Sequence, residues 1–349
     1  VDEQGVVGWL SRFARSWLAG WSQFWFTPRG PETLAVIRIC CGAMMTYIHC
    51  IWLSLLNSFM GSSAWIDGPT IRELHRQDWA WSWLFAVESP ALLFCHELIA
   101  IVACVCMTLG LATRLAIPLA WWMTLMVCHR MTGALFGLDQ VVMMLSMYLM
   151  WSRCGSLWSV DARIARRLKW QGTSEHIAGP AARMANRTPG NSFSSRVRHL
   201  LWPAAGPAES NSVVTRLIQL HLCVIYLFGG LSKMRGEMWW DGSAIWFSIV
   251  NYEYQSLNLT WLGQFPFIIG LITAITIFWE TYYCALIWPK LTRPMTLALA
   301  FLVHGSIGAA LGMWTFGTMM VVANFAFISP QFFRQLANRF LERSPATHG

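Results

Sequence analysis

The chain has 349 residues, of which 56% are hydrophobic and only 12% are charged. An average soluble domain carries roughly 25% charged residues, so this composition excludes a water-soluble globular fold. The 22 Trp and 20 Phe favour the boundary between lipid headgroups and hydrocarbon, and the net charge of +8 suits anionic headgroups better than nucleic acid. We therefore expect a membrane protein that contacts the lipid bilayer and binds no nucleic acid.

Residues 1–30 are predicted to form an interfacial amphipathic helix. Within 9–25, apolar residues recur at steps of three and four, namely Trp9, Leu10, Phe13, Trp17, Leu18, Trp21, Phe24 and Trp25. Polar residues, among them Arg12 and Arg15, fall on the opposite side. A helix of this kind lies at the membrane surface with its apolar face towards the acyl chains. Pro28 and Pro31 are expected to end it.

Eight stretches are apolar enough to cross the roughly 30 Å hydrocarbon layer as helices of about 20 residues. They lie at 34–56, 90–111, 114–132, 135–151, 213–232, 265–288, 294–311 and 313–329. The sequence thus predicts an all-α integral membrane protein with about eight transmembrane helices, four in 31–151 and four in 213–330. Two tryptophan-containing segments, 71–88 and 237–262, are predicted to be interfacial or re-entrant.

Residues 152–212 are rich in Arg, Gly, Pro, Ser and Asn, and we expect a partly disordered loop with an amphipathic start at 160–170. With eight spans, 20 of the 25 Lys and Arg residues fall on the membrane side that holds this loop and both termini. Because positive charge is retained in the cytoplasm, the loop, the N-terminus and the tail at 331–349 are predicted to be cytoplasmic.

Seven ionisable residues in or beside the spans lie in the non-cytoplasmic half when depth is counted at about 1.5 Å per residue. They are His49, His96, Glu97, His129, Asp139, Lys233 and His304, whereas Glu280 and His221 do not follow this pattern. Charged groups in hydrocarbon are costly unless paired or hydrated, so this group predicts a polar cavity open to the non-cytoplasmic side. In such a cavity Lys233 could act as a base. The alternative is that each residue bonds a local partner, and that Lys233 extends to the interface.

Metal and phosphate chemistry are not predicted. The ten cysteines form no CxxC pair and no zinc-like spacing with histidine, and neither a Gly-rich phosphate loop nor a nucleophile elbow occurs. The histidines within the spans also lack the regular spacing that pairs haem ligands.

Three segments of the sequence are characteristic when taken together, because their order and spacing match a known pattern across nearly the whole chain. The first is Leu157-Trp158-Ser159-Val160-Asp161, and the second runs from Tyr226 to Lys233 and continues to Trp240-Asp241-Gly242. The third comprises Thr292-Arg293-Pro294, His304, Gly312, Phe316-Gly317 and Ser329-Pro330. Together they resemble the membrane region of the vitamin K-dependent gamma-carboxylase, a domain family also called the horizontally transferred transmembrane domain (HTTM) in bacteria.

This resemblance implies an eight-span domain, a bacterial inner-membrane location and a site that faces the periplasm. In the carboxylase, a lysine matching Lys233 deprotonates a reduced quinone, oxygen addition yields a strong base that removes a proton from glutamate, and CO2 is captured. Lys233 and His304 are therefore expected to be catalytic, and a reduced quinone is the expected cofactor. In the same cavity, Asp139, His129, His49, His96 and Trp240 are expected to bind substrate.

The sequence departs from the family pattern at three places. Ser232-Lys233 stands where the carboxylase has two lysines, and Leu138-Asp139-Gln140 stands where it has an Asn-His pair. The large extramembrane domain that binds its peptide substrate does not follow the eighth span, so carboxylation would need a membrane or periplasmic partner that supplies it. Two other functions stay open: a non-catalytic scaffold or complex subunit that docks partners on 152–212, and a transporter that uses the polar cavity.

Overall fold

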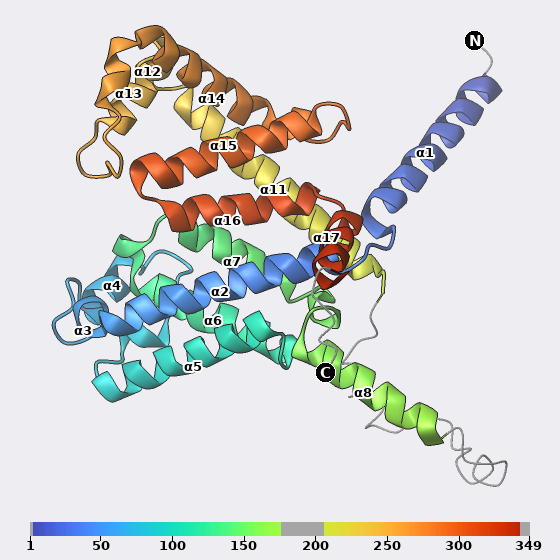
Figure 1. Cartoon of the computed structure of the whole chain (residues 1–349), viewed down its shortest axis with the longest axis horizontal. Helices are drawn as coiled ribbons and strands as arrows, with labels where there is room; N and C mark the ends of the chain where they lie inside the picture. The colour runs from blue at the N-terminus through green and yellow to red at the C-terminus, as the bar shows by residue number, and fades with distance from the viewer. Residues whose placement is uncertain (1–2, 176–205, 343–349) are drawn as a thin grey trace.

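The computed structural model describes residues 3–175 and 206–342, and within these ranges the chain is helical with no strands. Eight helices form a bundle (Figure 1). The N-terminal half contains α2 (Glu32–Ser54), α5 (Pro90–Leu109), α6 (Thr113–Arg130) and α7 (Gly137–Leu149). The C-terminal half contains α11 (Glu209–Lys233), α14 (Pro266–Leu286), α15 (Arg293–Leu311) and α16 (Trp314–Asn324). Each predicted span therefore falls on one of these helices.

Five of the eight helices are long and apolar enough to cross a membrane: α2, α5, α11, α14 and α15. A sixth span results if α16 and α17 (Pro330–Glu342), which are bent by 110° against each other, count as one broken span. By contrast, α6 carries arginine near both ends, and the 13 residues of α7 reach only about 20 Å. The all-α membrane architecture is thus confirmed, while the count of eight spans stays a prediction.

The sides of the helices show why the bundle needs an apolar surrounding. On α5, the buried residues are Leu93, His96, Glu97, Ala100, Ala103, Cys104 and Met107, whereas Leu92, Phe94, Leu98 and Val102 are exposed. A soluble helix buries its apolar side and exposes its charges, so this arrangement is inverted. It matches helices whose outer side faces lipid and whose polar residues face one another.

One end of the N-terminal half is held by polar side chains that bond to helix termini. The buried Arg38 on α2 donates to the carbonyl oxygens of Met107 (2.5 Å) and Thr108 (2.7 Å) at the end of α5, and to that of Trp158 (2.8 Å). Asp161 accepts from the backbone N–H groups of Ala112 (2.9 Å) and Thr113 (2.8 Å), and from the Thr113 hydroxyl. These bonds satisfy carbonyls at the end of α5 and N–H groups at the start of α6.

The other end is closed by the connection between α2 and α5, which includes α3 (Leu56–Phe59) and α4 (Gly68–Leu74). Arg130, the last residue of α6, donates to the carbonyl oxygen of Ile66 (2.9 Å), and the Ser82 hydroxyl donates to that of Met126 (2.8 Å). The end of α6 therefore lies beside the connection from α2 to α5, while its start lies at the Asp161 end. It follows that α6 runs between the same two ends of the bundle as α2 and α5.

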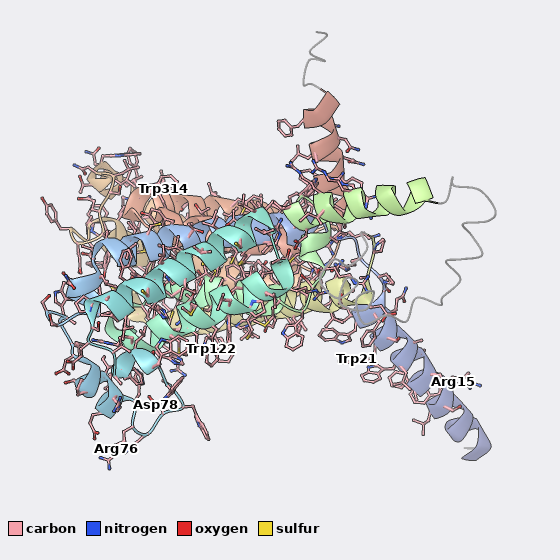
Figure 2. All side chains as sticks on the ribbon, turned by 90° about the horizontal axis from the view of Figure 1, so that it is seen from below. Arg15, Trp21, Arg76, Asp78, Trp122 and Trp314 are labelled. Atoms are coloured by element: carbon pink, nitrogen blue, oxygen red, sulfur yellow. The ribbon has the colours of Figure 1, made fainter. Side chains whose placement is uncertain are left out.

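Three helices extend away from one end of the bundle: α1 (Glu3–Phe26), α8 (Val160–Glu175) and α17 (Figures 1 and 2). The predicted N-terminal helix is confirmed as α1, and its predicted stop agrees with its end at Phe26. In the 152–212 region, 160–175 form α8, so the amphipathic start is helical. The disorder predicted there falls mainly on 176–205, outside the described residues.

Asp161→Ala should lower the stability of the protein by about 2–3 kcal/mol, because buried N–H groups at the start of α6 would lose a charged acceptor. The change would be measured as a lower midpoint of thermal unfolding in detergent. Asp78→Ala removes a carboxylate that is 67% exposed at the other end of the bundle and should leave the midpoint unchanged. Equal midpoints for Asp161→Ala and the wild type would contradict the role of Asp161 in holding the start of α6.

Candidate functional site

The C-terminal half of the bundle contains an ion pair between its helices. Lys233 Nζ on α11 lies 2.5 Å from Glu280 Oε2 on α14, and the side chains are 31% and 10% exposed. The helices approach closely here because Gly230 has no side chain, and a Cβ at this position would lie 2.7 Å from the backbone nitrogen of Thr281. Lys233 also lies over the ring of Trp239, with 5.6 Å between Nζ and the ring centre.

The position of this pair along α14 shows that Lys233 does not lie level with the first residue of that helix. Glu280 lies 14 residues after the first residue of α14, which corresponds to about 21 Å along the helix axis. Beyond Lys233, the chain folds back along α14 through α12 (Glu237–Trp240) and α13 (Ala244–Ile249). The Thr273 hydroxyl on α14 lies 3.0 Å from the carbonyl oxygen of Gly242 and binds this segment to the helix.

A chain of hydrogen bonds crosses the interior of the same half. The Tyr283 hydroxyl donates to Asn324 Oδ1 (2.6 Å), and Asn324 Nδ2 donates to the Tyr226 hydroxyl (2.9 Å). The Tyr226 hydroxyl oxygen lies 2.7 Å from His304 Nε2. All four side chains are buried, and they come from α11, α14, α15 and α16. The network therefore joins every helix of this half.

The direction of these bonds defines the state of His304. The Tyr226 oxygen accepts a hydrogen bond from Asn324 Nδ2, so its own hydrogen has His304 Nε2 as its partner. A neutral imidazole then carries its hydrogen on Nδ1. That nitrogen is buried and has no hydrogen-bond partner among the described residues. Buried donors are almost always paired, so a free Nδ1–H is a place where an acceptor oxygen of another molecule can bind.

Two features of the sequence bring the ion pair and the network into one region. Tyr226 and Lys233 are seven residues apart, so they lie on the same side of α11. Trp279 directly precedes Glu280, and its ring centre lies 5.0 Å from that of Tyr226 and 6.3 Å from that of His304. The ring centre of Phe316 lies 5.8 Å from that of His304. The predicted catalytic residues Lys233 and His304 thus belong to the same half, with aromatic rings around them.

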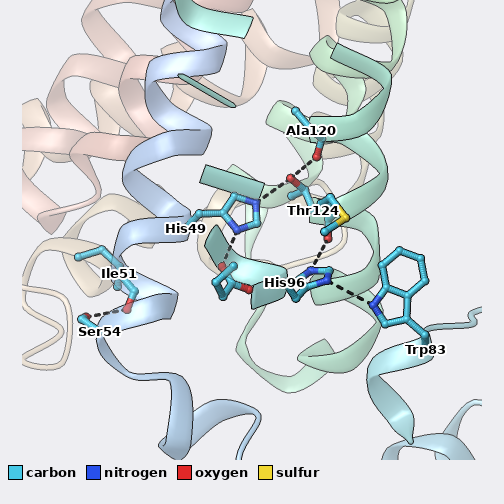
Figure 3. A network of polar contacts seen from close by, with 9 residues as sticks. His49, Ile51, Ser54, Trp83, His96, Ala120 and Thr124 are labelled. Atoms are coloured by element: carbon cyan, nitrogen blue, oxygen red, sulfur yellow. Dashed lines mark hydrogen bonds and ion pairs between the residues drawn. The ribbon is translucent and has the colours of Figure 1, made fainter. Parts of the chain in front are cut away.

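The predicted substrate-binding histidines of the N-terminal half form a separate network (Figure 3). His49 Nδ1 lies 2.7 Å from Glu97 Oε2, and His49 Nε2 lies 2.9 Å from the Thr124 hydroxyl. His96 Nε2 lies 3.2 Å from the carbonyl oxygen of Met123. The side chains of His49 and Glu97 are both 0% exposed. These residues connect α2, α5 and α6 and do not join the Lys233 region.

The other three predicted residues have local partners. His129 Nδ1 lies 2.7 Å from the carbonyl oxygen of Trp81. Asp139 accepts from the backbone N–H of Phe136 (3.0 Å) and so caps the start of α7. Trp240 is exposed and donates to the carbonyl oxygen of Met234 (2.7 Å). For these residues the structure favours the alternative in which each bonds a nearby partner, and the predicted single cavity divides into separate contacts.

The sequence prediction did not assign Glu280, Tyr226, Tyr283 and Asn324 to the site. Glu280 carried a usable signal, because it is an acidic residue in the middle of an apolar stretch, where a basic partner is expected. No comparable signal exists for Asn324 or for the two tyrosines. Among the described residues, no group of three or more His, Cys, Asp or Glu side chains is arranged to hold a metal ion.

The Lys233–Glu280 pair should be more sensitive to loss of one partner than to loss of both. Glu280→Gln leaves an ammonium without its counter-charge and should cost about 1–3 kcal/mol, less than for a fully buried pair because Lys233 is partly exposed. The double variant Lys233→Met/Glu280→Gln should recover most of that loss. Thermal unfolding in detergent would measure both, with Lys290→Met, at an exposed lysine, as control. A double variant no more stable than Glu280→Gln would argue against the pair.

Comparison of the chain with models of known protein families, with curated proteins and with solved structures matched none of them.

Proposed function

We propose that this chain is a membrane-embedded enzyme that removes a proton from a lipid-soluble hydroxyl compound of the reduced quinone class, with Lys233 as the base. The observation that carries the proposal is the Lys233–Glu280 contact at 2.5 Å, in the half of the bundle that also holds the buried Nδ1 of His304, which has no partner among the described residues. Ionisable groups among apolar helices are expensive to keep and are therefore candidates for function.

The ion pair defines how Lys233 would act as a base. A neighbouring carboxylate stabilises the ammonium form, so Lys233 first has to pass a proton to Glu280 Oε2 across 2.5 Å. The neutral amine then accepts the hydroxyl proton of the substrate and becomes an ammonium again. The substrate anion is paired with this ammonium, while Glu280 stays neutral. One proton has left the substrate and one has been gained by the pair, so charge is balanced.

His304 and the aromatic residues would orient the substrate. The Nδ1–H of His304 can donate to an oxygen of the substrate, because Nε2 is already bonded to Tyr226. Trp279 and Phe316 flank the imidazole and offer apolar ring surface. A planar ring with oxygens on opposite sides fits a site that has a base and a separate hydrogen-bond donor.

We also propose that the chain belongs to the HTTM and vitamin K-dependent carboxylase-like domains, with eight spans, cytoplasmic termini and a site on the periplasmic side of a bacterial inner membrane. The segment Tyr226–Lys233 supports this membership, because it supplies Tyr226, Gly230 and Lys233 to the site. The contacts at both ends of α6 support a full crossing by that helix.

Lys233→Ala should reduce quinol-dependent oxygen uptake by the purified protein by on the order of 10²- to 10⁴-fold, the usual contribution of a positioned base. Glu280→Gln should also lower the rate, since the proton acceptor for Lys233 would be missing. Lys290→Ala is the matched control and should keep the wild-type rate, because Lys290 is exposed and lies between α14 and α15. Equal rates in Lys233→Ala and wild type would remove this mechanism.

Epitope tags at Gly133 and at the C-terminus test the eight-span topology in sealed membrane vesicles. With eight spans, the turn at Gly133 is on the non-cytoplasmic side and the C-terminus is cytoplasmic. If α6 and α7 did not cross, both tags would be cytoplasmic when α16 crosses. If only the five long apolar helices crossed, the C-terminal tag would change sides. Antibody access from one side of the membrane distinguishes these patterns.

A further inference from the structure

The three helices that extend from the bundle leave it at the same end and in different directions (Figures 1 and 2). The backbone N–H of Arg29, just after α1, donates to the carbonyl oxygen of Ala208, just before α11, with 3.2 Å between nitrogen and oxygen. Arg334 Nε on α17 donates to Glu32 Oε1 on α2 at 2.8 Å. Asp161 anchors the start of α8 to the start of α6. All three helices are thus attached where α2, α6 and α11 begin.

On α1 the apolar side is not covered by the other residues that the structure describes. The large apolar residues Trp9, Leu10, Phe13, Trp17, Leu18 and Trp21 are each more than half exposed. Trp9 stacks on Phe13 and Trp17 stacks on Trp21, each with 5.5 Å between ring centres, so the side is a continuous aromatic surface. Arg12 and Arg15 are exposed on the other side. Only the last turn is packed, where the Arg216 guanidinium lies 4.0 Å from the centre of the Phe24 ring.

α17 has the same division into two sides. Phe332, Leu336 and Phe340 follow one another at four-residue steps and are exposed, while Arg339 is exposed next to them. Phe333 is 7% exposed and packs on Phe325, which holds the first turn to the bundle. The remaining apolar side of α17 therefore faces away from the protein.

α8 and the adjoining turns add positive charge at this end. Arg163, Arg166 and Arg167 are exposed on α8. Arg114 and Arg153 line a hollow between the start of α6 and the turn before α8. Asp161 also lines it, but the Asp161 oxygens already accept three hydrogen bonds. The charges that stay available to an anion are those of the arginines.

We infer that α1, α8 and α17 form a collar that binds the headgroups of anionic phospholipids on one leaflet. Exposed aromatic and leucine side chains beside arginines are the composition of a helix that lies in the headgroup region, with its apolar side against the acyl chains. The opposite end of the bundle also exposes aromatic side chains, but there Arg72 and Arg76 are mixed with exposed Glu73 and Asp78. Among the described residues, the exposed arginines of the collar end outnumber its exposed carboxylate, Glu209, so this end matches an anionic surface in charge better than the opposite end. This inference does not depend on the proposed enzymatic function.

The test uses the full chain reconstituted with spin-labelled phosphatidylglycerol or phosphatidylcholine, and measures the fraction of each lipid that is immobilised at the protein. The wild type should retain phosphatidylglycerol several-fold more than phosphatidylcholine. Raising the salt to 1 M should remove most of this preference, because the Debye length falls to about 3 Å. A wild-type protein that retains both lipids equally would overturn the proposal.

A collar variant with Arg15→Gln, Arg163→Gln and Arg339→Gln removes one exposed charge from each helix. It should bring the retention ratio close to one, since a single arginine near an anionic surface can contribute up to about a fivefold effect, as large as the whole expected preference. The matched control removes three exposed arginines at the other end, through Arg72→Gln and Arg76→Gln with Arg235→Gln. An equal loss in both variants would show that net charge alone sets the preference, and would also overturn the collar.

Discussion

The cost of a polar group in an apolar surrounding decides how this bundle is built. A charged side chain between lipid-facing helices has to find a partner, and the partner has to come from another helix if the side chain faces the interior. Lys233 and Glu280 connect α11 to α14 in this way, and His49 and Glu97 connect α2 to α5. Most apolar contacts tolerate small shifts between helices, but these pairs do not. They therefore fix which faces of the helices meet.

The two pairs differ in their exposure and in which polar atom near them lacks a hydrogen-bond partner. The Thr124 hydroxyl donates to the carbonyl oxygen of Ala120, so it has to accept from His49 Nε2, and a single proton is shared between His49 Nδ1 and Glu97. The side chains of this pair have no exposed surface, and its one atom without a hydrogen-bond partner among the described residues is an acceptor, Glu97 Oε1. Lys233, in contrast, is partly exposed, and the nearby network ends in the free Nδ1–H of His304. A partly open base and an unused donor are what a substrate needs, so the C-terminal half is the better candidate for chemistry.

The sequence was sufficient to place the helices, because long apolar stretches and Gly or Pro breaks define where each one begins and ends. It could not group their polar residues correctly. Counting residues gives depth along a helix but not the neighbour that each side faces, so His49 and Lys233 were assigned to one cavity. Counting also separates Glu280 from Lys233, because it places Lys233 in the non-cytoplasmic half and Glu280 outside it. In the structure α12 and α13 fold back along α14, and Lys233 pairs with Glu280, six residues before the end of that helix.

The segments that carry the family resemblance have unequal weight as evidence of function. In Leu157–Asp161, the Asp161 oxygens and the Trp158 carbonyl are used to hold helix ends, so this segment speaks for a shared fold and not for a shared reaction. The segment Tyr226–Lys233 instead supplies the hydroxyl that orients His304 and the amine that meets Glu280. Ser232, which stands where the family that this segment resembles has a lysine, is exposed, and Lys233 contacts Glu280. If the chain keeps the chemistry of that family, it has to do so with one lysine, and Glu280 is the neighbouring group that can exchange a proton with it.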